Sequence, residues 1–318
     1  MSSPQLRPPS AARPLSPGAV ALMLMLCLSW GFNQVAVKLA LPDIPPMLQA
    51  TIRSAGALIV LFLIARLRNV KMFGRDGTLG AGVLAGVIFA LEFVLIYRGL
   101  LLTSASRAVV FLYTAPFFVA FGSYIFLGER LRASQWGGLV LCFAGVALAI
   151  GVPQADVDAN VLLGDLMLVG GGALWGASTL VVKGTALIKA PAEKGLAYQV
   201  AISVPILGFA AWIFGETLTR VPGPLALSLM VYQAVWVVGL TFLIWFSLVK
   251  TYSASKLSAF TFITPLFGVL ASYLIMHDTL SLAFGAAALL VIAGLYVVNR
   301  PDPAVPVGTD SLLNVTKT

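Results

Sequence analysis

The sequence predicts an all-α integral membrane protein: ten transmembrane helices forming two inverted five-helix repeats, with both termini cytoplasmic. The 318 residues are 59% hydrophobic and only 10% charged, and the mean hydropathy is +0.98. Soluble domains carry about a quarter charged residues, so a soluble globular enzyme is excluded, and disordered chains are polar rather than apolar. Two further observations support this fold class: the distribution of Lys and Arg among the loops, and an internal repeat in the sequence.

A spanning helix needs about 20 apolar residues, and Gly, Pro or charged clusters separate ten such runs in this chain. Each run is therefore expected to cross the bilayer once. We place the spans at 18–41, 46–66, 77–101, 104–127, 134–151, 163–187, 194–215, 224–249, 253–276 and 280–299.

The organisation follows from these spans. Residues 1–17 form a disordered cytoplasmic lead, 18–151 the first five-helix unit and 152–162 a periplasmic linker. Residues 163–299 form the second unit, and 300–318 a cytoplasmic tail. The apolar run from 18 is too long for the core of a signal peptide, so we interpret it as the first span.

Positive charge predicts the orientation, because cytoplasmic loops are enriched in Lys and Arg. Fourteen Lys and Arg residues lie in the lead, the even-numbered loops and the tail. The opposite loops carry only Arg98, Arg107 and Arg220. Both termini are therefore expected in the cytoplasm. Arg98 and Arg107 flank one short loop and are the exceptions to the pattern.

Two stretches recur at nearly equal offsets. Residues 30–38 match 175–183 at four of nine positions, an offset of 145, and 104–127 match 253–276 at eight of 24, an offset of 149. Each unit contains five spans, an odd number, so the second copy enters the membrane from the opposite face. Secondary transporters often have this inverted plan, with the substrate near the midplane between the repeats.

Trp30 and Trp175 occupy the middle of the first and sixth spans, where an indole N–H needs a partner or water. Asn33 and Ser178 follow three residues later, on the same helical face. We expect these four residues to line a central substrate cavity. The alternative is helix packing, in which Gly31 and its counterpart in the sixth span allow close approach.

Four tyrosine and tryptophan residues are further cavity candidates. Tyr232, Trp236 and Gly239 form an i, i+4, i+7 stripe on the eighth span. Tyr113 lies in the middle of the fourth span, and Tyr97 near the outer end of the third. The alternative for each is that it faces lipid, since aromatic residues are common in membrane proteins.

Pro116 and Pro265 lie at corresponding mid-span positions and lack the amide N–H of other residues. We therefore expect the carbonyls of Leu112 and Thr261 to lose their helical partners, and the two spans to kink. The kinks serve either as gates in a conformational change or as static bends.

Glu92 is the carboxylate closest to a predicted midplane, where an unpaired charge is costly. It is the candidate for proton coupling or for contact with a cationic substrate group. The alternatives are a structural ion pair with Arg53, Arg98 or Lys38, and a glutamic acid that stays permanently protonated. Arg53 by itself is close enough to an interface to extend its charge to the headgroups. The same is expected of Lys38 and of Lys183, its counterpart in the sixth span.

We expect no cofactor, metal site, disulfide or catalytic activity. Cys27 and Cys142 lie inside apolar runs, and His277 is the single histidine. The sequence has no P-loop, nucleophile elbow or zinc motif. The basic residues occur between apolar runs, so we expect the lipid bilayer and a small-molecule substrate as partners, and not nucleic acid.

The two five-helix units, the Trp-Gly near the middle of each opening span, and Pro116 followed by Gly128-Glu129 resemble the EamA branch of the drug/metabolite transporter superfamily. The second copy keeps Pro265 but has His277-Asp278 in place of Gly-Glu. Within the family the chain looks most like YddG-type amino-acid exporters. The resemblance implies an EamA-like unit in each half of the chain and a permease of a bacterial inner membrane.

The resulting expectation is a secondary transporter that exports amino acids, aromatic or neutral ones, by alternating access. It would act as a monomer or weak homodimer. One alternative is export of lipophilic cations, drugs, nucleotide sugars or nucleobases by the same fold, because fold does not fix the cargo. A receptor or scaffold without transport, or an intramembrane enzyme, is a further alternative.

Overall fold

The computed structural model describes residues 15–103, 105–150, 158–277 and 283–300. Most of the expected lead, linker and tail therefore lies outside the described residues. Seven spans are continuous helices: α1 (Pro17–Ala40), α2 (Pro46–Leu67), α3 (Leu79–Leu102), α6 (Ala133–Ile150), α7 (Ala159–Gly184), α8 (Ala192–Ile213) and α13 (Phe284–Asn299).

The other three spans are interrupted. The fourth comprises α4 (Ala105–Leu112), α5 (Ala115–Gly122) and the π-turn η1 (Ser123–Leu127). The eighth comprises α9 (Pro224–Val231), the π-helical η3 (Tyr232–Thr241) and α10 (Phe242–Thr251). The ninth comprises α11 (Ala254–Phe260), the 3₁₀ turn η4 (Thr261–Ile263) and α12 (Thr264–Met276), and a further 3₁₀ turn, η2 (Ala186–Ile188), follows α7.

Each expected span coincides with helix in the described part of the chain. Nine of these helical segments are long and apolar enough to cross a membrane, whereas α13 is apolar but has only 16 residues. The largest shift at the start of a completely described span is at α7. Residues 159–162, expected in the linker, are helical because the Asp158 side chain accepts a hydrogen bond from the amide of Val161 and caps α7.

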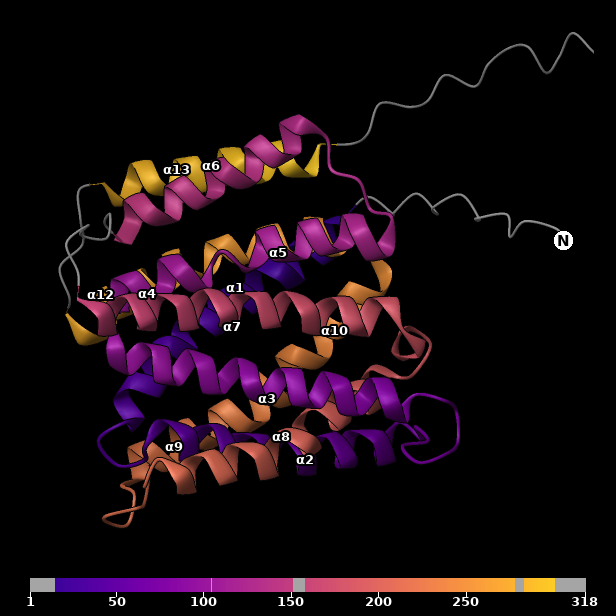
Figure 1. Cartoon of the computed structure of the whole chain (residues 1–318), viewed down its shortest axis with the longest axis vertical. Coiled ribbons are helices and arrows are strands. Elements are labelled where there is room, and N and C mark those ends of the chain that lie inside the picture. The colour runs from indigo at the N-terminus through magenta and orange to yellow at the C-terminus, as the bar shows by residue number, and fades with distance from the viewer. Residues whose placement is uncertain (1–14, 104, 151–157, 278–282, 301–318) are drawn as a thin grey trace, which may run out of the picture.

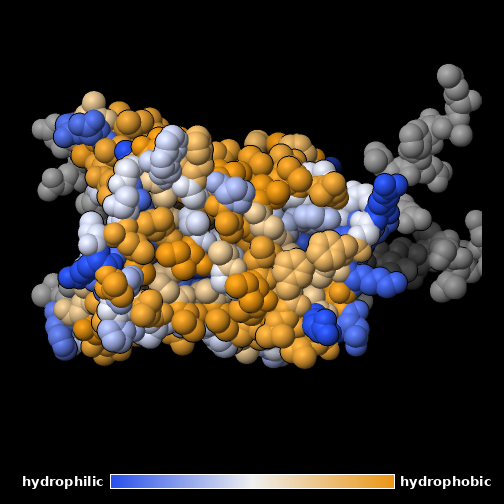
Figure 2. Space-filling model, turned by 90° about the horizontal axis from the view of Figure 1, so that it is seen from below, coloured by the Kyte–Doolittle hydropathy of each residue, from blue (hydrophilic) through white to orange (hydrophobic). Residues whose placement is uncertain are grey.

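The helices lie side by side as one bundle (Figure 1). Helices α6 and α13 pack together at one edge, α2, α8 and α9 lie at the other, and α1, α3, α7 and α10 lie between them. A band of hydrophobic side chains covers the middle of the face in Figure 2, and hydrophilic groups gather at its two ends. This distribution is the one that a bilayer imposes on a spanning bundle.

Glycines set the closest helix contacts. At Gly31 of α1 an added Cβ would lie 2.7 Å from the Gly268 amide nitrogen and the Phe267 Cβ of α12. At Gly176 of α7 it would lie 3.0 Å from the Cβ of Phe118 of α5. Phe118 and Phe267 correspond at the 149-residue offset, so α1–α12 and α7–α5 make the same contact. Both glycines follow the tryptophans of the repeated motif, and both support close packing.

The two mid-span prolines begin new helices. Pro116 stands at the start of α5 and Pro265 at the start of α12, so each span breaks just before its proline. The expectation for Thr261 is wrong, because its carbonyl accepts from the amide of Thr264 in the 3₁₀ turn. The Leu112 carbonyl faces Gly172 of α7, and an added Cβ there would lie 2.8 Å from this oxygen.

Replacement of Gly31 by Leu should destabilise the bundle by about 1–3 kcal/mol, because the new side chain must displace the α12 backbone. Thermal unfolding of the purified protein in detergent measures this effect. Gly137→Leu is the control, since Gly137 is exposed and has nothing within 4 Å of an added Cβ. Equal melting temperatures for the two variants would contradict the assigned role of Gly31.

Candidate functional site

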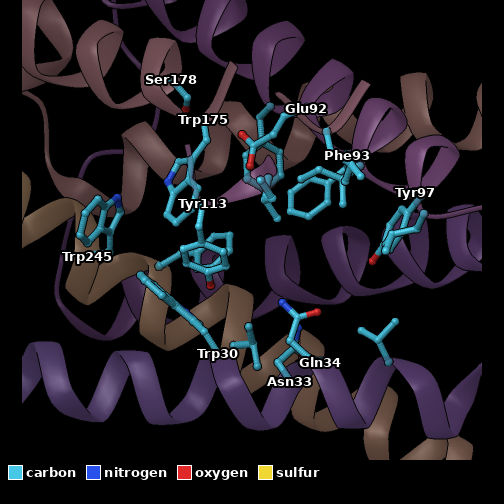
Figure 3. A pocket seen from close by; sticks show the side chains of 18 of the residues that line it. Trp30, Asn33, Gln34, Glu92, Phe93, Tyr97, Tyr113, Trp175, Ser178 and Trp245 are labelled. Atoms are coloured by element: carbon cyan, nitrogen blue, oxygen red, sulfur yellow. The ribbon is translucent and has the colours of Figure 1, made fainter. Parts of the chain in front are cut away.

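A cavity of about 180 Å³ lies between α1, α3, α4, α7 and α10. An apolar cavity of about 150 Å³ accepts a benzene molecule, so this volume suits a small organic compound. The wall extends from Trp30 and Trp175, in the middle of their helices, to Leu100 near the end of α3 and Ala108 in α4. Figure 3 shows Trp30, Tyr113 and Trp175 gathered on one side, Phe93 and Tyr97 on the other, and Glu92 between the two groups.

Trp30 is held by contacts with the eighth span. Its indole N–H donates to the Thr241 hydroxyl at 2.8 Å, which supplies the partner that a mid-membrane indole needs. Its ring packs edge-on against Phe242 and Trp245, at centroid distances of 6.0 and 5.7 Å. These contacts fix the orientation of one aromatic wall.

Trp175 forms the corresponding wall from the second half of the chain. Its ring meets Tyr113 edge-on at 6.2 Å. Tyr113 is buried and lies at the break between α4 and α5, just before Pro116. The proline break therefore positions Tyr113, although Pro116 and Pro265 themselves do not line the cavity.

One face of α3 supplies the opposite wall. Phe89, Phe93 and Tyr97 recur every four residues and their rings contact one another in sequence, at 4.9 and 6.0 Å. Glu92 lies on the same face and is 7% exposed. No hydrogen bond or ion pair joins its carboxylate to another described residue, so the ion pair with Arg53, Arg98 or Lys38 that was the alternative for Glu92 is absent from the described structure.

The cavity also contains the expected polar candidates. Asn33 and Ser178 both line it, on α1 and α7. The side-chain oxygen of Asn33 is buried and has no hydrogen-bond partner among the described residues. Ser178 is 5% exposed and lies beside Thr179, whose hydroxyl donates to the Trp175 carbonyl.

Tyr232 and Trp236 lie outside this cavity lining. The Tyr232 hydroxyl donates to the Ser29 carbonyl at 2.9 Å, and the Trp236 indole donates to the Ser29 hydroxyl at 3.0 Å. The expected stripe assumed α-helical spacing, but both residues belong to the π-helical η3, where each turn contains more residues. The wider turn directs Val237 to the cavity instead.

Arg53 was expected at an interface, but its side chain is buried, only 2% exposed, and lines the cavity. Further residues line the cavity that were not expected from the sequence. For those on α3, the available signal was their helical spacing from Glu92, which places them on the same face. The missed residues are Gln34, Val37, Phe89, Phe93, Ile96, Leu100, Ala108, Val109, Leu112, Leu168, Thr179, Gln199, Val237, Phe242, Trp245 and Phe246.

A polar cluster, which we call the Glu129 latch, ties three spans together at one end of the bundle. It comprises Glu129, Lys183, Ser253, Ala254 and Ser255. The Lys183 ammonium lies 2.6 Å from the Glu129 carboxylate, and the Ser253 hydroxyl donates to it at 2.7 Å. The backbone amides of Ala254 and Ser255 donate to the same carboxylate at 3.3 and 3.4 Å, so it caps the start of α11.

The backbone conformation of Gly128 directs Glu129 toward the start of α11. Gly128 ends the fourth span with φ of 68°, in the left-handed region that favours glycine, and so reverses the chain direction. His277 takes the same conformation, φ 58°, at the end of α12. The acidic residue that follows it, Asp278, lies outside the described residues. Lys183, expected to reach the lipid interface, is instead an ion-pair partner.

The pKa of Glu129 lies below that of an ordinary glutamate. Burial raises this pKa, but the charge of Lys183, followed by the hydrogen bonds from Lys183 and Ser253, lowers it by more. The carboxylate is therefore stabilised in its charged form, and the latch persists until the pH falls through this lowered pKa.

Other ion pairs tie the loops at the opposite end. Asp43 accepts from the Gly223 amide at 2.8 Å and pairs with Arg220, and these two contacts lower its pKa. Arg107 at the start of the fourth span pairs with Asp165 of α7. Glu216 accepts from the Met47 amide at 2.8 Å and so caps α2, while burial raises the pKa of its carboxyl.

No group of three or more His, Cys, Asp or Glu residues in the described ranges has a geometry that would hold a metal ion. Cys27 and Cys142 are both free and buried. The described site is thus an aromatic cavity with a few charged and amide groups, rather than a metal centre or a thiol site.

Comparisons with known proteins agree on one family. The model of the EamA-like transporter family matches residues 17–151 and again 162–300. The chain is 28% identical to the uncharacterized transporter YvbV of Bacillus subtilis, over 89% of this chain and 92% of that one. It is 26% identical to a probable amino-acid metabolite efflux pump of Salmonella typhimurium, over 87% and 93% of the respective chains.

The fold is also known from a solved crystal structure. That chain superimposes with a TM-score of 0.77 at 18% sequence identity, covering 89% of this chain and 96% of its own length. The similarity supports the fold alone. The two family matches and the apolar helices identify a multi-pass membrane transporter, and the chain belongs to the EamA-like transporter family.

Proposed function

We propose that the protein is a secondary transporter that exports neutral and aromatic amino acids across a bacterial inner membrane by alternating access. The observation that carries this proposal is the cavity between Trp30 and Trp175, which combines stacked aromatic rings with a few buried polar groups. Aromatic walls bind apolar side chains, and buried polar groups bind the polar ends of the substrate. A similar protein of Salmonella typhimurium is named a probable amino-acid metabolite efflux pump.

Two inverted repeats would explain the position of this cavity. The family model matches twice, and the Gly31 and Gly176 contacts correspond between the halves. The helix pairs follow the same rule: α1 packs on α12 as α7 packs on α5, and α2 packs on η3 as α8 packs on α3. These equivalences support a pseudo-twofold axis in the membrane plane, close to the cavity.

Charge supports cytoplasmic termini. The start of α1 and the end of α13 lie at the same end of the bundle (Figure 1). Ser16 bonds Tyr252 at this end, and Arg132 donates to the Arg300 carbonyl. The loops rich in Lys and Arg are joined here too, through pairs such as Arg68 with Glu193 at 3.0 Å. Positive charge at the end that carries both termini favours the cytoplasmic side.

In this orientation the Glu129 latch is on the cytoplasmic side, and the cavity extends from mid-membrane toward the periplasmic side. The conformation would then be closed to the cytoplasm. Loading of an exported substrate requires the opposite state, so the latch must open in each cycle. A charged latch of this kind is suited to a reversible gate. When it opens, the few hydrogen bonds within the latch are replaced by hydrogen bonds to water.

We expect Trp30→Ala and Trp175→Ala each to reduce amino-acid flux in proteoliposomes by about tenfold or more, because each removes a large apolar contact surface. Trp212→Ala is the matched control: Trp212 is 73% exposed and stacks on Phe209 away from the cavity. Amounts of reconstituted protein are compared in each case. Unchanged flux in both cavity variants would remove the tryptophans from the site and the proposal with them.

Glu129→Gln should open the cytoplasmic side, because the amide keeps the shape but loses the ion pair with Lys183. A membrane-impermeant maleimide in inside-out vesicles would then label a cysteine introduced at Ser178 several-fold faster. Glu193→Gln, which breaks the pair with Arg68 at the same end, is the control. Equal labelling of the two variants would contradict the latch.

The same assay has a pH dependence. Because the pKa of Glu129 is below its ordinary value, the unmodified latch should hold equally at about pH 7 and about pH 5.5. It should weaken only in more acidic buffer, as the carboxylate is protonated. Faster labelling already at about pH 5.5 in the protein with intact Glu129 would show that the carboxylate is not stabilised in its charged form.

A further inference from the structure

The cavity contains a carboxyl group and a guanidinium group that do not pair with each other. Glu92 of α3 and Arg53 of α2 both line it, at 7% and 2% exposure. No hydrogen bond or ion pair joins the two side chains in the described structure. Buried charges are normally paired, because an unpaired one costs several kcal/mol.

Arg53 is held in place without being neutralised. Its guanidinium carbon lies 4.2 Å from the centre of the Phe93 ring. This contact orients the guanidinium plane and leaves its N–H groups for other partners. The Nε and Nη2 atoms of Arg53 have no hydrogen-bond partner among the described residues. A guanidinium in this condition presents a donor pair that matches a carboxylate.

Gln199 adds a third buried polar group to the cavity lining. It lies on α8, which packs against α2. Gln199 is fully buried, lines the cavity, and has no partner among the described residues for either its amide nitrogen or its amide oxygen. Buried polar atoms are satisfied in most proteins, so these exceptions along one cavity point to a ligand.

We propose that Arg53 and Glu92 form a recognition site for the zwitterionic head of an α-amino acid, in the cavity that Gln199 also lines. Arg53 binds the substrate carboxylate, and Glu92 binds the ammonium group. This inference rests on the proposed function and goes beyond it by assigning each substrate charge to a residue.

Charge balance separates this site from one for a simple cation or anion. A lone cation at Glu92 leaves Arg53 unpaired and is repelled by it, and a lone anion at Arg53 leaves Glu92 unpaired. A zwitterion satisfies both charges and keeps the cavity neutral overall. The aromatic walls then contact the side chain of the same molecule, as the ring contacts of Trp30, Tyr113 and Trp175 allow.

The test uses three probes with the same aromatic body: phenylalanine, phenylethylamine and phenylpropionate. Their binding to the purified full-length protein is measured by titration calorimetry, and phenylalanine counterflow is measured in proteoliposomes. The unmodified protein should bind phenylalanine about tenfold or more tightly than either analogue, because only phenylalanine engages both charges.

The variants should separate the two charges. Glu92→Gln should abolish the preference for phenylalanine over phenylpropionate, and Arg53→Gln the preference over phenylethylamine. Arg98→Gln is the matched control, because Arg98 lies 4.1 Å over the Phe214 ring in the same manner but does not line the cavity. It should bind all three probes as the unmodified protein does.

A double variant, Glu92→Gln with Arg53→Gln, addresses a purely structural role. If the charges only neutralise each other, the double variant regains phenylalanine binding, and the proposal is overturned. If they bind substrate, it no longer distinguishes the three probes. Melting temperatures in detergent identify any variant that has failed to fold, and for such a variant Glu92→Asp and Arg53→Lys replace the Gln changes and should weaken the same preference.

Different results would overturn the zwitterion site and amino-acid export. An unmodified protein that transports phenylalanine, with single variants that lose no preference, leaves amino-acid export standing and overturns the zwitterion site. An unmodified protein that binds and transports phenylethylamine but not phenylalanine overturns the amino-acid substrate itself. Transport of phenylalanine with the expected loss of preference supports both.

Discussion

The close packing of two helix pairs at Gly31 and Gly176 is the constraint on which the rest of the structure depends. Each glycine lets a backbone approach where a Cβ would meet its neighbour. Within a bilayer, lipid is as apolar as the side chains, so helices are held by such fitted contacts and not by water exclusion. Because a tryptophan precedes each glycine, the same contacts fix the rotation of α1 and α7 and so place Trp30 and Trp175 at the cavity.

A second constraint is the satisfaction of polar groups in the membrane. The helix breaks before Pro116 and Pro265 illustrate it, since Thr261 is satisfied by a 3₁₀ turn and the Leu112 carbonyl lies against Gly172. The break before Pro116 carries Tyr113 into the cavity. Backbone irregularity is tolerated where protein surrounds it, and here it coincides with the site.

Ionisable side chains have different surroundings at the ends of the bundle and in its middle. At the ends, carboxylates such as Glu129 and Asp43 are paired and hydrogen-bonded, and their pKa values are lowered by those partners. In the cavity, Arg53 and Glu92 have no such partners among the described residues. Paired groups hold a conformation, whereas unpaired buried groups are retained at a cost in stability, which is expected where a ligand binds.

The sequence by itself determined the spans, the family and four of the nine aromatic residues that line the cavity, because apolar run length, the Trp-Gly motifs and Pro116 are local signals. It also identified Glu92 from its depth in a span. Only the tertiary structure decided which side chains meet. Residues Tyr232 and Trp236 turn toward Ser29 because η3 is π-helical, and Arg53 faces the cavity because α2 packs against α8. Helix rotation and packing depend on contacts between residues far apart in the chain, and no local pattern encodes them.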